Sequence, residues 1–178
     1  MVFMNEWYAD LAILESYLET VDYKTSTSRL KKFGIKRSVG GSVTYGLTKR
    51  SYLTPTMCRE FCPNNKMYKT VLYTDRPELM EVFYEFRDLY FPGFEFTSVQ
   101  LNKNYKIGRH KDIMNCGESV LVSCGDYENG LTVVEIDDIH QEFDSRLMPV
   151  VFDGSKYFHY VKDFTGTRYS CVFYRDTL

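Results

Sequence analysis

Residues 96–102 have the sequence Phe96-Thr97-Ser98-Val99-Gln100-Leu101-Asn102, in which polar and apolar side chains alternate and predict a β-strand with one buried face. Further short strands are predicted after it, at residues 119–123, 131–136, 148–152, 157–161 and 169–174. Turn residues separate several of these segments, and no helical period interrupts this half of the chain. Many short strands without helices between them indicate an antiparallel sandwich or barrel.

The residues before 94 contain the predicted helices. Tryptophan and leucine side chains recur every three or four positions from about residue 5 to residue 20, which is the spacing of an amphipathic helix. A second helix is predicted over about 77–90, with Thr74 or Asp75 as its cap and Pro77 in its first turn. The sequence therefore predicts an α+β fold that is mainly β, with flanking N-terminal helices.

Composition limits the class of protein. The chain has 178 residues, 44% of them hydrophobic, which suits one globular domain over 1–178. It lacks a run of about 20 apolar residues, so no membrane partner is expected. The first residues do not resemble a secretory signal, and the odd number of cysteines, five, is typical of reduced thiols. We expect an intracellular protein, cytoplasmic or nuclear and not secreted, with Cys116, Cys124 and Cys171 in the core.

Basic residues are concentrated in segment 22–72. It holds eleven Lys or Arg residues and two acidic residues, a net charge of +9 in a chain whose formal net charge is −2. Short tyrosine-containing runs between Gly and Pro residues predict one or two short strands and long connections there. A basic segment of this kind suits a polyanionic partner such as nucleic acid. The alternative is a solvated face that is balanced by acidic neighbours in the fold.

Two of the three histidines occur in an informative arrangement. In His110-Lys111-Asp112 the imidazole and the carboxylate are two residues apart, so on a strand they project to one face. His159 lies inside another predicted strand. Two imidazoles and one carboxylate form the facial triad of non-haem Fe(II) sites, which leaves coordination positions open. The third histidine, His140, lies in a polar segment and is expected to be exposed.

Arg168 and Ser170 share one face of the last predicted strand. A guanidinium beside a hydroxyl can clamp a carboxylate, because arginine offers two parallel N–H donors and serine adds a third. A clamp near a metal ligand suits a co-substrate that chelates the metal at one end and reaches Arg168 at the other. The shape of 2-oxoglutarate meets that requirement.

A resemblance to Fe(II)/2-oxoglutarate-dependent dioxygenases is carried by two blocks. The first is Asn102-Lys103-Asn104-Tyr105-Lys106-Ile107-Gly108-Arg109-His110-Lys111-Asp112, which resembles the family signature N-x-Y-x-x-G-x-x-x-H-x-D, with one residue between the glycine and the histidine. The second runs from Phe158-His159 to Arg168-Tyr169-Ser170 and resembles the distal His and Arg-x-Ser block. The resemblance covers about residues 94–176 and is nearest to the AlkB-like and TET/JBP branches and to small viral or algal members.

The resemblance implies a double-stranded β-helix, or jelly roll, over 94–178. It implies that His110, Asp112 and His159 hold Fe(II), and that Arg168, helped by Ser170, binds the distal carboxylate of 2-oxoglutarate. Tyr105 and Asn102 are implied as further contacts of this co-substrate. With O2 as the other co-substrate, the implied reaction is hydroxylation of a C–H bond. Residues 1–93 then supply the N-terminal helices and a basic lid or substrate segment.

Three readings of the substrate remain open. A nucleic-acid base is favoured by segment 22–72 and by the positive charge of Lys103, Lys106, Arg109 and Lys111 beside the metal motif. A protein or peptide side chain, of the prolyl or lysyl type, is the second. A non-catalytic binding module of the same fold is the third. Asn115 and Ser119 lie near the expected mouth of the pocket and are candidates to touch the substrate.

Overall fold

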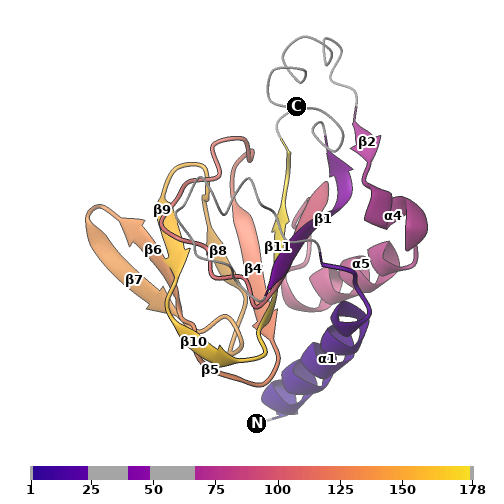
Figure 1. The fold of residues 1–178 in the computed structure, drawn as a ribbon, viewed down its shortest axis with the longest axis horizontal. Coiled ribbons are helices and arrows are strands. Elements are labelled where there is room, and N and C mark those ends of the chain that lie inside the picture. Colours follow the sequence, from indigo (N-terminus) through magenta and orange to yellow (C-terminus); the bar gives the residue numbers. More distant parts are fainter. Residues whose placement is uncertain (1, 24–39, 49–66, 177–178) are drawn as a thin grey trace.

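The computed structural model describes residues 2–23, 40–48 and 67–176. The helices are α1 (Val2–Glu19), α4 (Val71–Asp75) and α5 (Leu79–Tyr90). The strands are β1 (Gly41–Thr48), β2 (Tyr68–Lys69), β3 (Ser98–Lys103), β4 (Ser119–Cys124), β5 (Tyr127–Asn129), β6 (Thr132–Ile136), β7 (Ile139–Phe143), β8 (Val150–Phe152), β9 (Phe158–Val161), β10 (Phe164–Gly166) and β11 (Tyr169–Tyr174). Figure 1 shows the helices together on one side of the β layers.

The larger layer is a six-stranded antiparallel sheet with the strand order β2-β1-β3-β11-β4-β8. Strand β11 lies between β3 and β4, and its register places Ser170 opposite both Asn102 and Ser123. Directly opposed residues of neighbouring strands point to the same face, so these three polar side chains share one face of the sheet. Because side chains alternate along β11, Cys171 and Phe173 point to the opposite face.

A smaller layer faces this sheet. It comprises the three-stranded sheet β7-β6-β9 and the pair β10-β5, which Figure 1 shows to the left of and below the larger sheet. Between the layers, Val134 of β6 packs with Leu121, Val150 and Phe152 of the larger sheet. Two antiparallel layers with helices at the N-terminal side confirm the prediction of a mainly β, α+β fold.

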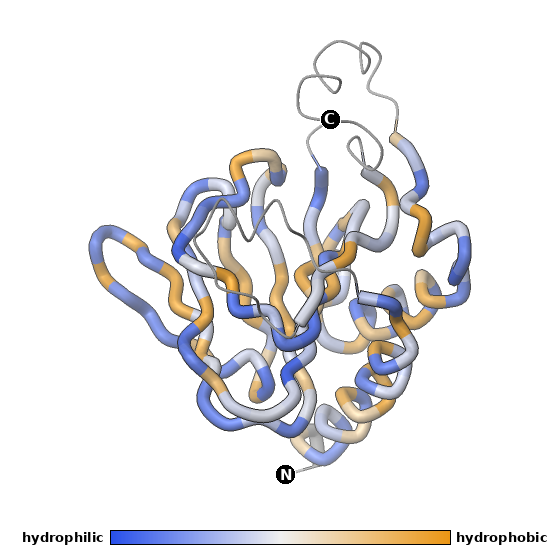
Figure 2. Tube along the Cα trace, in the orientation of Figure 1, coloured by the Kyte–Doolittle hydropathy of each residue, from blue (hydrophilic) through white to orange (hydrophobic). Residues whose placement is uncertain are grey.

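Helices α1 and α5 cover the other face of the larger sheet. Trp7, Leu11, Leu14 and Leu18 of α1 are buried, and their spacing places them on one side of the helix. Apolar residues recur along these helices and along the central strands (Figure 2). Phe173 of β11 lies at the centre of this core and is fully buried. Its ring makes edge contacts with its neighbours, at centroid distances of 5.8 Å to Phe83, 5.0 Å to Phe91 and 5.2 Å to Phe96.

Replacing Phe173 by alanine tests how much this helix–sheet core contributes to the stability of the protein. We expect the free energy of unfolding to fall by about 3–5 kcal/mol, because the change opens a cavity among three aromatic rings. Urea denaturation followed by circular dichroism measures the loss. Leu89 of α5 is 65% exposed, so Leu89→Ala is the control and costs less than about 1 kcal/mol. A similar loss in both variants would contradict the central position of Phe173.

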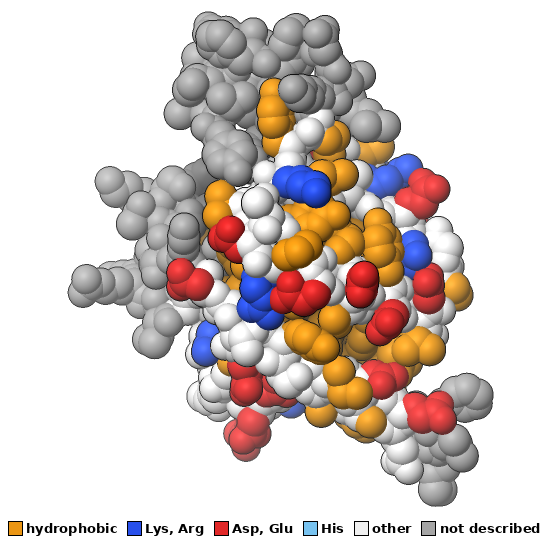
Figure 3. Space-filling model, turned by 90° about the vertical axis from the view of Figure 1, so that its right-hand side faces the viewer, with side chains coloured by type: hydrophobic (Ala, Val, Ile, Leu, Met, Phe, Trp, Pro, Cys, Tyr) orange, Lys and Arg blue, Asp and Glu red, His pale blue; other side chains and the backbone are white. Residues whose placement is uncertain are grey.

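The outer side of the helices carries mixed chemistry. Figure 3 shows hydrophobic side chains interspersed with acidic and basic ones on this side of the molecule. Exposed apolar residues of α1 and α5 include Tyr8, Ile13 and Leu89. Among the residues that the structure describes, no helix has the length and the apolar character needed to span a membrane.

The second predicted helix, over about 77–90, is confirmed as α5. Helix α5 begins at Leu79, but a separate helix, α4, precedes it. The predicted caps are wrong, because Thr74 and Asp75 form the last turn of α4. Thr70 is the N-cap of α4, and its hydroxyl accepts a hydrogen bond of 3.2 Å from the backbone N–H of Tyr73. The sequence between 74 and 78 therefore marks a junction between two helices rather than the start of one.

Strand β7 was not predicted, because its segment is polar and was expected to be a loop. It pairs with β6 through the whole of Ile139–Phe143, and four of its five residues are exposed. Of its side chains only Phe143 packs against the cluster between the layers, so its sequence does not show the alternation of a half-buried strand. The turn that joins β6 to β7 uses Asp137 and Asp138, whose φ angles of 50° and 62° are typical of a two-residue hairpin turn.

Most of the basic segment 22–72 lies outside the described residues. Of its eleven basic residues only Lys69 is described, and its ammonium group lies 4.9 Å from the centre of the Tyr73 ring. The described part contains β1 and β2, in agreement with the one or two predicted strands. Among the cysteines, Cys124 and Cys171 are buried as predicted, whereas the prediction for Cys116 is wrong. Cys116 is exposed because it lies in the connection between Asp112 and β4.

Candidate metal centre and carboxylate site

Two histidines are brought together by an isolated antiparallel β-bridge. The backbone N–H of His110 donates to the carbonyl of His159 at 3.1 Å, and the N–H of His159 donates to the carbonyl of His110 at 3.0 Å. Directly paired residues project to the same side, and the two imidazole rings lie with their centroids 4.2 Å apart. Residues far apart in the sequence therefore present their side chains at one point between the layers.

Asp112 completes this group without a continuous strand. The sequence prediction placed His110 and Asp112 on one strand, but only a single bridge forms at His110 and Asp112 follows outside any strand. The backbone N–H of Asp112 donates to the carbonyl of Gly154 at 2.8 Å, which fixes the position of the carboxylate. Its two oxygens lie 3.5 Å from Nε2 of His110 and 3.3 Å from Nε2 of His159.

The three side chains offer donor atoms that suit a metal ion. One ligand atom from each of His110, Asp112 and His159 lies within 4.8 Å of the others, so the group could hold a metal ion. Nδ1 of His110 lies 2.8 Å from the carbonyl of Gly108, and Nδ1 of His159 lies 3.1 Å from the carbonyl of Tyr157. A carbonyl only accepts, so each Nδ1 carries a proton, and each Nε2 is the ring nitrogen that faces Asp112 and would bind a metal ion.

The charge state of Asp112 also suits metal binding. Burial alone would raise the pKa of this carboxyl group, but hydrogen bonds from His110 and His159 outweigh burial and hold its pKa below the usual range. The group is therefore an anion at neutral pH. Two imidazoles and one carboxylate, without thiolates, form a donor set that suits Fe(II) and related divalent ions.

The triad is buried, and Phe152 and Gly154 lie beside it. His110 and His159 are 9% and 6% exposed. The ring of Phe152 packs against His159 with a centroid distance of 4.8 Å. A Cβ atom added at Gly154 would lie 3.4 Å from both the Asp112 carboxylate and the His159 ring. Glycine at this position thus leaves open the space beside the ligand atoms.

Arg168 forms the second half of the site. It is 2% exposed, and its guanidinium forms no ion pair with any carboxylate of the described residues. Its Nε has no hydrogen-bond partner there, and its Nη2 lies 3.5 Å from the hydroxyl of Ser145. The rings of Tyr127 and Phe164 lie 5.4 Å and 5.8 Å from the guanidinium carbon. Burial lowers the pKa of Arg168. A buried cation without a counter-charge is costly, so this pocket favours an anionic ligand.

Asn104 fixes the backbone at Arg168 through two hydrogen bonds. Its side-chain oxygen accepts from the N–H of Arg168 at 2.8 Å, and its own N–H donates to the Arg168 carbonyl at 2.8 Å. Its φ angle of 48° is a left-handed conformation, which asparagine adopts more readily than most residues. Sequence reasoning missed this role, although an asparagine directly before Tyr105 was visible as a signal.

The other predicted co-substrate residues are also near the larger sheet's inner face. Ser170 is 4% exposed, and its hydroxyl accepts a hydrogen bond of 3.2 Å from the side-chain amide of Asn102. Tyr105 is buried at 3% exposure. Ser119 is fully buried and Asn115 is half-buried, with 3.5 Å between the Asn115 amide nitrogen and the Ser119 hydroxyl. The structure does not assign a ligand to any of these residues, so their roles stay predictions.

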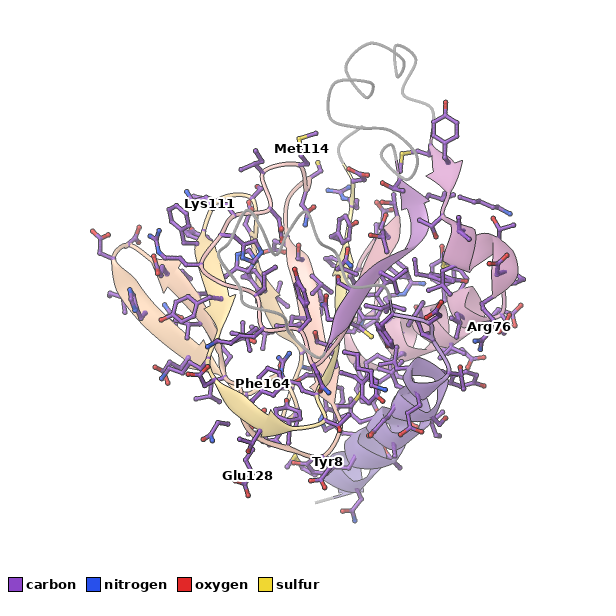
Figure 4. The ribbon with its side chains drawn as sticks, in the orientation of Figure 1. Tyr8, Arg76, Lys111, Met114, Glu128 and Phe164 are labelled. Atoms are coloured by element: carbon purple, nitrogen blue, oxygen red, sulfur yellow. The ribbon has the colours of Figure 1, made fainter. Side chains whose placement is uncertain are left out.

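The triad and the guanidinium lie at different levels between the layers. Figure 4 shows Lys111, which lies between His110 and Asp112, and Met114 at one end of the strands. Phe164, which contacts Arg168, lies nearer the opposite end. The arrangement therefore suits one ligand with two functional ends rather than a small ion alone.

The basic side chains beside the metal motif are partly neutralised. Arg109 forms a bidentate ion pair with Glu135, in which Nε lies 2.8 Å from Oε1 and Nη2 lies 2.7 Å from Oε2. Lys106 pairs with Asp163. Lys111 instead lies over the ring of Phe158, with its ammonium group 4.5 Å from the ring centre. The positive charge that the sequence suggested at this rim is thus reduced by acidic neighbours on the smaller layer.

His140 is exposed, as predicted, and lies apart from the triad. It belongs to β7 and lines a hollow of about 440 Å³ on the outer side of the smaller layer, together with Arg109, Glu135, Asp138 and Tyr160. Because β-strand side chains alternate, Arg109 and Tyr160 point away from the side on which their neighbours His110 and His159 lie. This hollow therefore contains none of the predicted metal or co-substrate residues.

Similar solved structures share this fold. The chain is similar to an oxidoreductase of the 2OG-Fe(II) oxygenase family from Burkholderia pseudomallei (TM-score 0.59, 16% identity, 92% of this chain and 77% of that one). It is similar to a Pseudomonas putida prolyl-4-hydroxylase (TM-score 0.54, 10% identity, 95% and 87%) and to NgTET1 in complex with 5mC DNA (TM-score 0.51, 14% identity, 84% and 66%). The match spans just under two thirds of NgTET1. No protein-family model and no curated protein matches the sequence.

These likenesses show the fold. The two antiparallel layers are the jelly roll found in solved 2OG-Fe(II) oxygenases, which confirms the fold that the sequence resemblance implied. At identities of 10–16% the fold alone is transferred. The chemistry of this chain must be argued from its own side chains.

Proposed function

We propose that this protein is an Fe(II)- and 2-oxoglutarate-dependent dioxygenase that hydroxylates a C–H bond. The proposal rests on one observation, which is that the triad and the buried Arg168 guanidinium occur in the same fold. A triad of two imidazoles and one carboxylate suits a divalent metal, and a buried guanidinium without a carboxylate partner in the described residues suits an anion. A 2-oxo acid with a distal carboxylate satisfies both groups at once.

Each residue has a defined task under this proposal. His110, Asp112 and His159 would hold the iron, with both Nδ1–H groups fixed on backbone carbonyls so that the rings cannot turn. Arg168 would bind the distal carboxylate, and Ser170 would donate a further hydrogen bond to it. When bound, the iron would supply the O2 activation that no side chain of the protein can provide. Phe152 and the apolar residues between the layers would exclude water from the reacting centre.

The substrate we propose first is a base of a nucleic acid. The net charge of +9 in segment 22–72 supports this proposal, because phosphate neutralisation dominates the affinity of such complexes. The similarity in fold to NgTET1, solved in complex with 5mC DNA, supports it as well. A peptide side chain is the second candidate, and the similarity to a prolyl-4-hydroxylase over 87% of that chain favours it.

Succinate release tests the activity and separates the substrates. The protein, supplied with Fe(II), 2-oxoglutarate and O2, is incubated with panels of oligonucleotides, peptides and free metabolites. We expect succinate formation above background with single-stranded oligonucleotides and a fall in their binding as the salt concentration rises. Stimulation by peptides alone would replace the first substrate class by the second. Absence of metal uptake and of succinate in every panel would refute the proposed activity.

A further inference from the structure

A ladder of polar side chains crosses the inner face of the larger sheet. It starts on β1, crosses to β3, returns to β1, crosses to β3 again and ends on β11 beside the carboxylate site. Its members are joined by four hydrogen bonds. In order they are Thr44, Gln100, Ser42, Asn102 and Ser170. The strand registers place Thr44 opposite Gln100, and Ser42 opposite Asn102, which in turn lies opposite Ser170.

All four hydrogen bonds run in the same direction. The Thr44 hydroxyl donates to Oε1 of Gln100 at 2.8 Å, and Nε2 of Gln100 donates to the Ser42 hydroxyl at 2.6 Å. The Ser42 hydroxyl then donates to Oδ1 of Asn102 at 2.8 Å. Finally, Nδ2 of Asn102 donates to Oγ of Ser170 at 3.2 Å. The Ser42 hydroxyl in the middle accepts from Gln100 and donates to Asn102.

The last hydroxyl of the ladder, that of Ser170, has a proton available for donation. Ser170 accepts from Asn102, so its own O–H is the next donor. Among residues 2–23, 40–48 and 67–176, this hydroxyl donates no hydrogen bond to another group. Ser170 is 4% exposed and follows Arg168 by two residues, so its O–H is directed into the same inner region as the guanidinium.

We propose that Asn102, Ser42 and Gln100 are positioning residues that orient the Ser170 hydroxyl as a donor to the distal carboxylate of 2-oxoglutarate. This inference rests on the proposed function. It changes the role that the sequence suggested for Asn102, from direct co-substrate contact to action through Ser170. Donation to a carboxylate is a charge-assisted hydrogen bond, which is stronger than a neutral one, so fixing its direction in advance favours binding.

If all four hydrogen bonds of the ladder were reversed, Ser170 would no longer be a donor to the co-substrate. Reversal would require the side-chain amides of Asn102 and Gln100 to flip together, because the Ser42 hydroxyl has only one proton to donate. The Ser170 proton would then point to Oδ1 of Asn102 and be lost to the co-substrate. The amide of Asn102 can both donate and accept, whereas a carboxylate at this position can only accept.

The substitution Asn102→Asp therefore imposes the reversed state on Ser170. Its carboxylate accepts from Ser42 and from Ser170, so the Ser170 hydroxyl turns away from the co-substrate. We expect the dissociation constant of 2-oxoglutarate, measured calorimetrically with Mn(II) and without O2, to rise on the order of tenfold. Asn129→Asp makes the same chemical change at an exposed position on β5 and is the matched control, with unchanged binding.

A double-mutant cycle separates positioning from charge repulsion. Asn102→Asp is measured in the wild-type background and again in the presence of Ser170→Ala. If Asn102 acts through Ser170, most of its effect disappears in the Ser170→Ala background, and only repulsion by the new carboxylate persists. An equal factor in both backgrounds would overturn the positioning role.

A shorter ligand distinguishes positioning of the Ser170 hydroxyl from a merely structural role of Ser170. The probe 2-oxobutyrate keeps the 2-oxo acid end but lacks the distal carboxylate. Ser170→Ala should weaken binding of 2-oxoglutarate and leave binding of 2-oxobutyrate unchanged. Equal weakening of both ligands would overturn the inference. Failure of the wild-type protein to bind 2-oxoglutarate at all would instead contradict the proposed function itself.

Discussion

Replacing His159 by alanine abolishes succinate formation and lowers the affinity for a divalent metal by at least about 100-fold. The physical reason is the loss of one of three donor atoms that lie within 4.8 Å of one another. The remaining imidazole of His110 and the Asp112 carboxylate still face each other, at 3.5 Å, but two ligands do not define a facial site. Metal affinity is measured by titration with Mn(II) or Fe(II) in the absence of O2.

The matched control for this change is His140→Ala. His140 is also a histidine on a strand of the smaller layer, but it is exposed and lines the outer hollow. We expect unchanged metal affinity and unchanged turnover in that variant. Circular dichroism and thermal unfolding show whether either variant has lost its fold. If His159→Ala remains folded and binds metal as tightly as the wild-type protein, the triad is not the metal centre.

The second large effect is expected from Arg168→Met. Its affinity for 2-oxoglutarate falls by about two orders of magnitude, because about 3 kcal/mol of charge-assisted bonding to the distal carboxylate is lost. Without 2-oxoglutarate, the same variant unfolds with a free energy about 1–3 kcal/mol higher than the wild-type protein. A buried guanidinium without an ion-pair partner in the described residues costs free energy, and methionine has a similar length without the charge.

Two measurements on the same variant test this prediction. Urea denaturation without ligand gives the change in the free energy of unfolding, and added 2-oxoglutarate should raise the unfolding midpoint of the wild-type protein only. Arg76→Met is the control, since Arg76 is partly exposed and pairs with Glu78 on the helix side of the sheet. It should change stability by less than about 1 kcal/mol and leave ligand binding intact. Strong destabilisation by Arg168→Met would show that Arg168 serves the fold rather than a ligand.

The strands that line this site could be predicted because one of their faces is buried. In β3 and β11 the apolar residues at every second position pack against the helices, and that burial is what the alternation in the sequence records. Strand β7 shows no such alternation, because four of its five residues are exposed and only Phe143 packs between the layers. The sequence also did not predict α4. Thr74 and Asp75 are residue types that typically cap the start of a helix, but here they end one.

The site residues could be proposed from the sequence, but their arrangement could not. Chemistry and spacing singled out His110, Asp112, His159 and Arg168, whereas the isolated bridge that joins the two histidines is a contact between distant segments. The two backbone hydrogen bonds between Asn104 and Arg168 join residues 64 positions apart, and an asparagine in the sequence does not by itself specify that contact. The polar ladder on β1 and β3 likewise depends on strand register, which alternation alone does not set.

The most direct test of the metal and co-substrate site is an anaerobic titration followed by visible absorption. The purified protein is first given Fe(II) and then 2-oxoglutarate, with O2 excluded. We predict that an absorption band appears only when both have been added, that it is absent in His159→Ala, and that Arg168→Met needs about 100-fold more 2-oxoglutarate to develop it. A wild-type protein that takes up no Fe(II), or that shows no 2-oxoglutarate-dependent change, would contradict the proposed dioxygenase site.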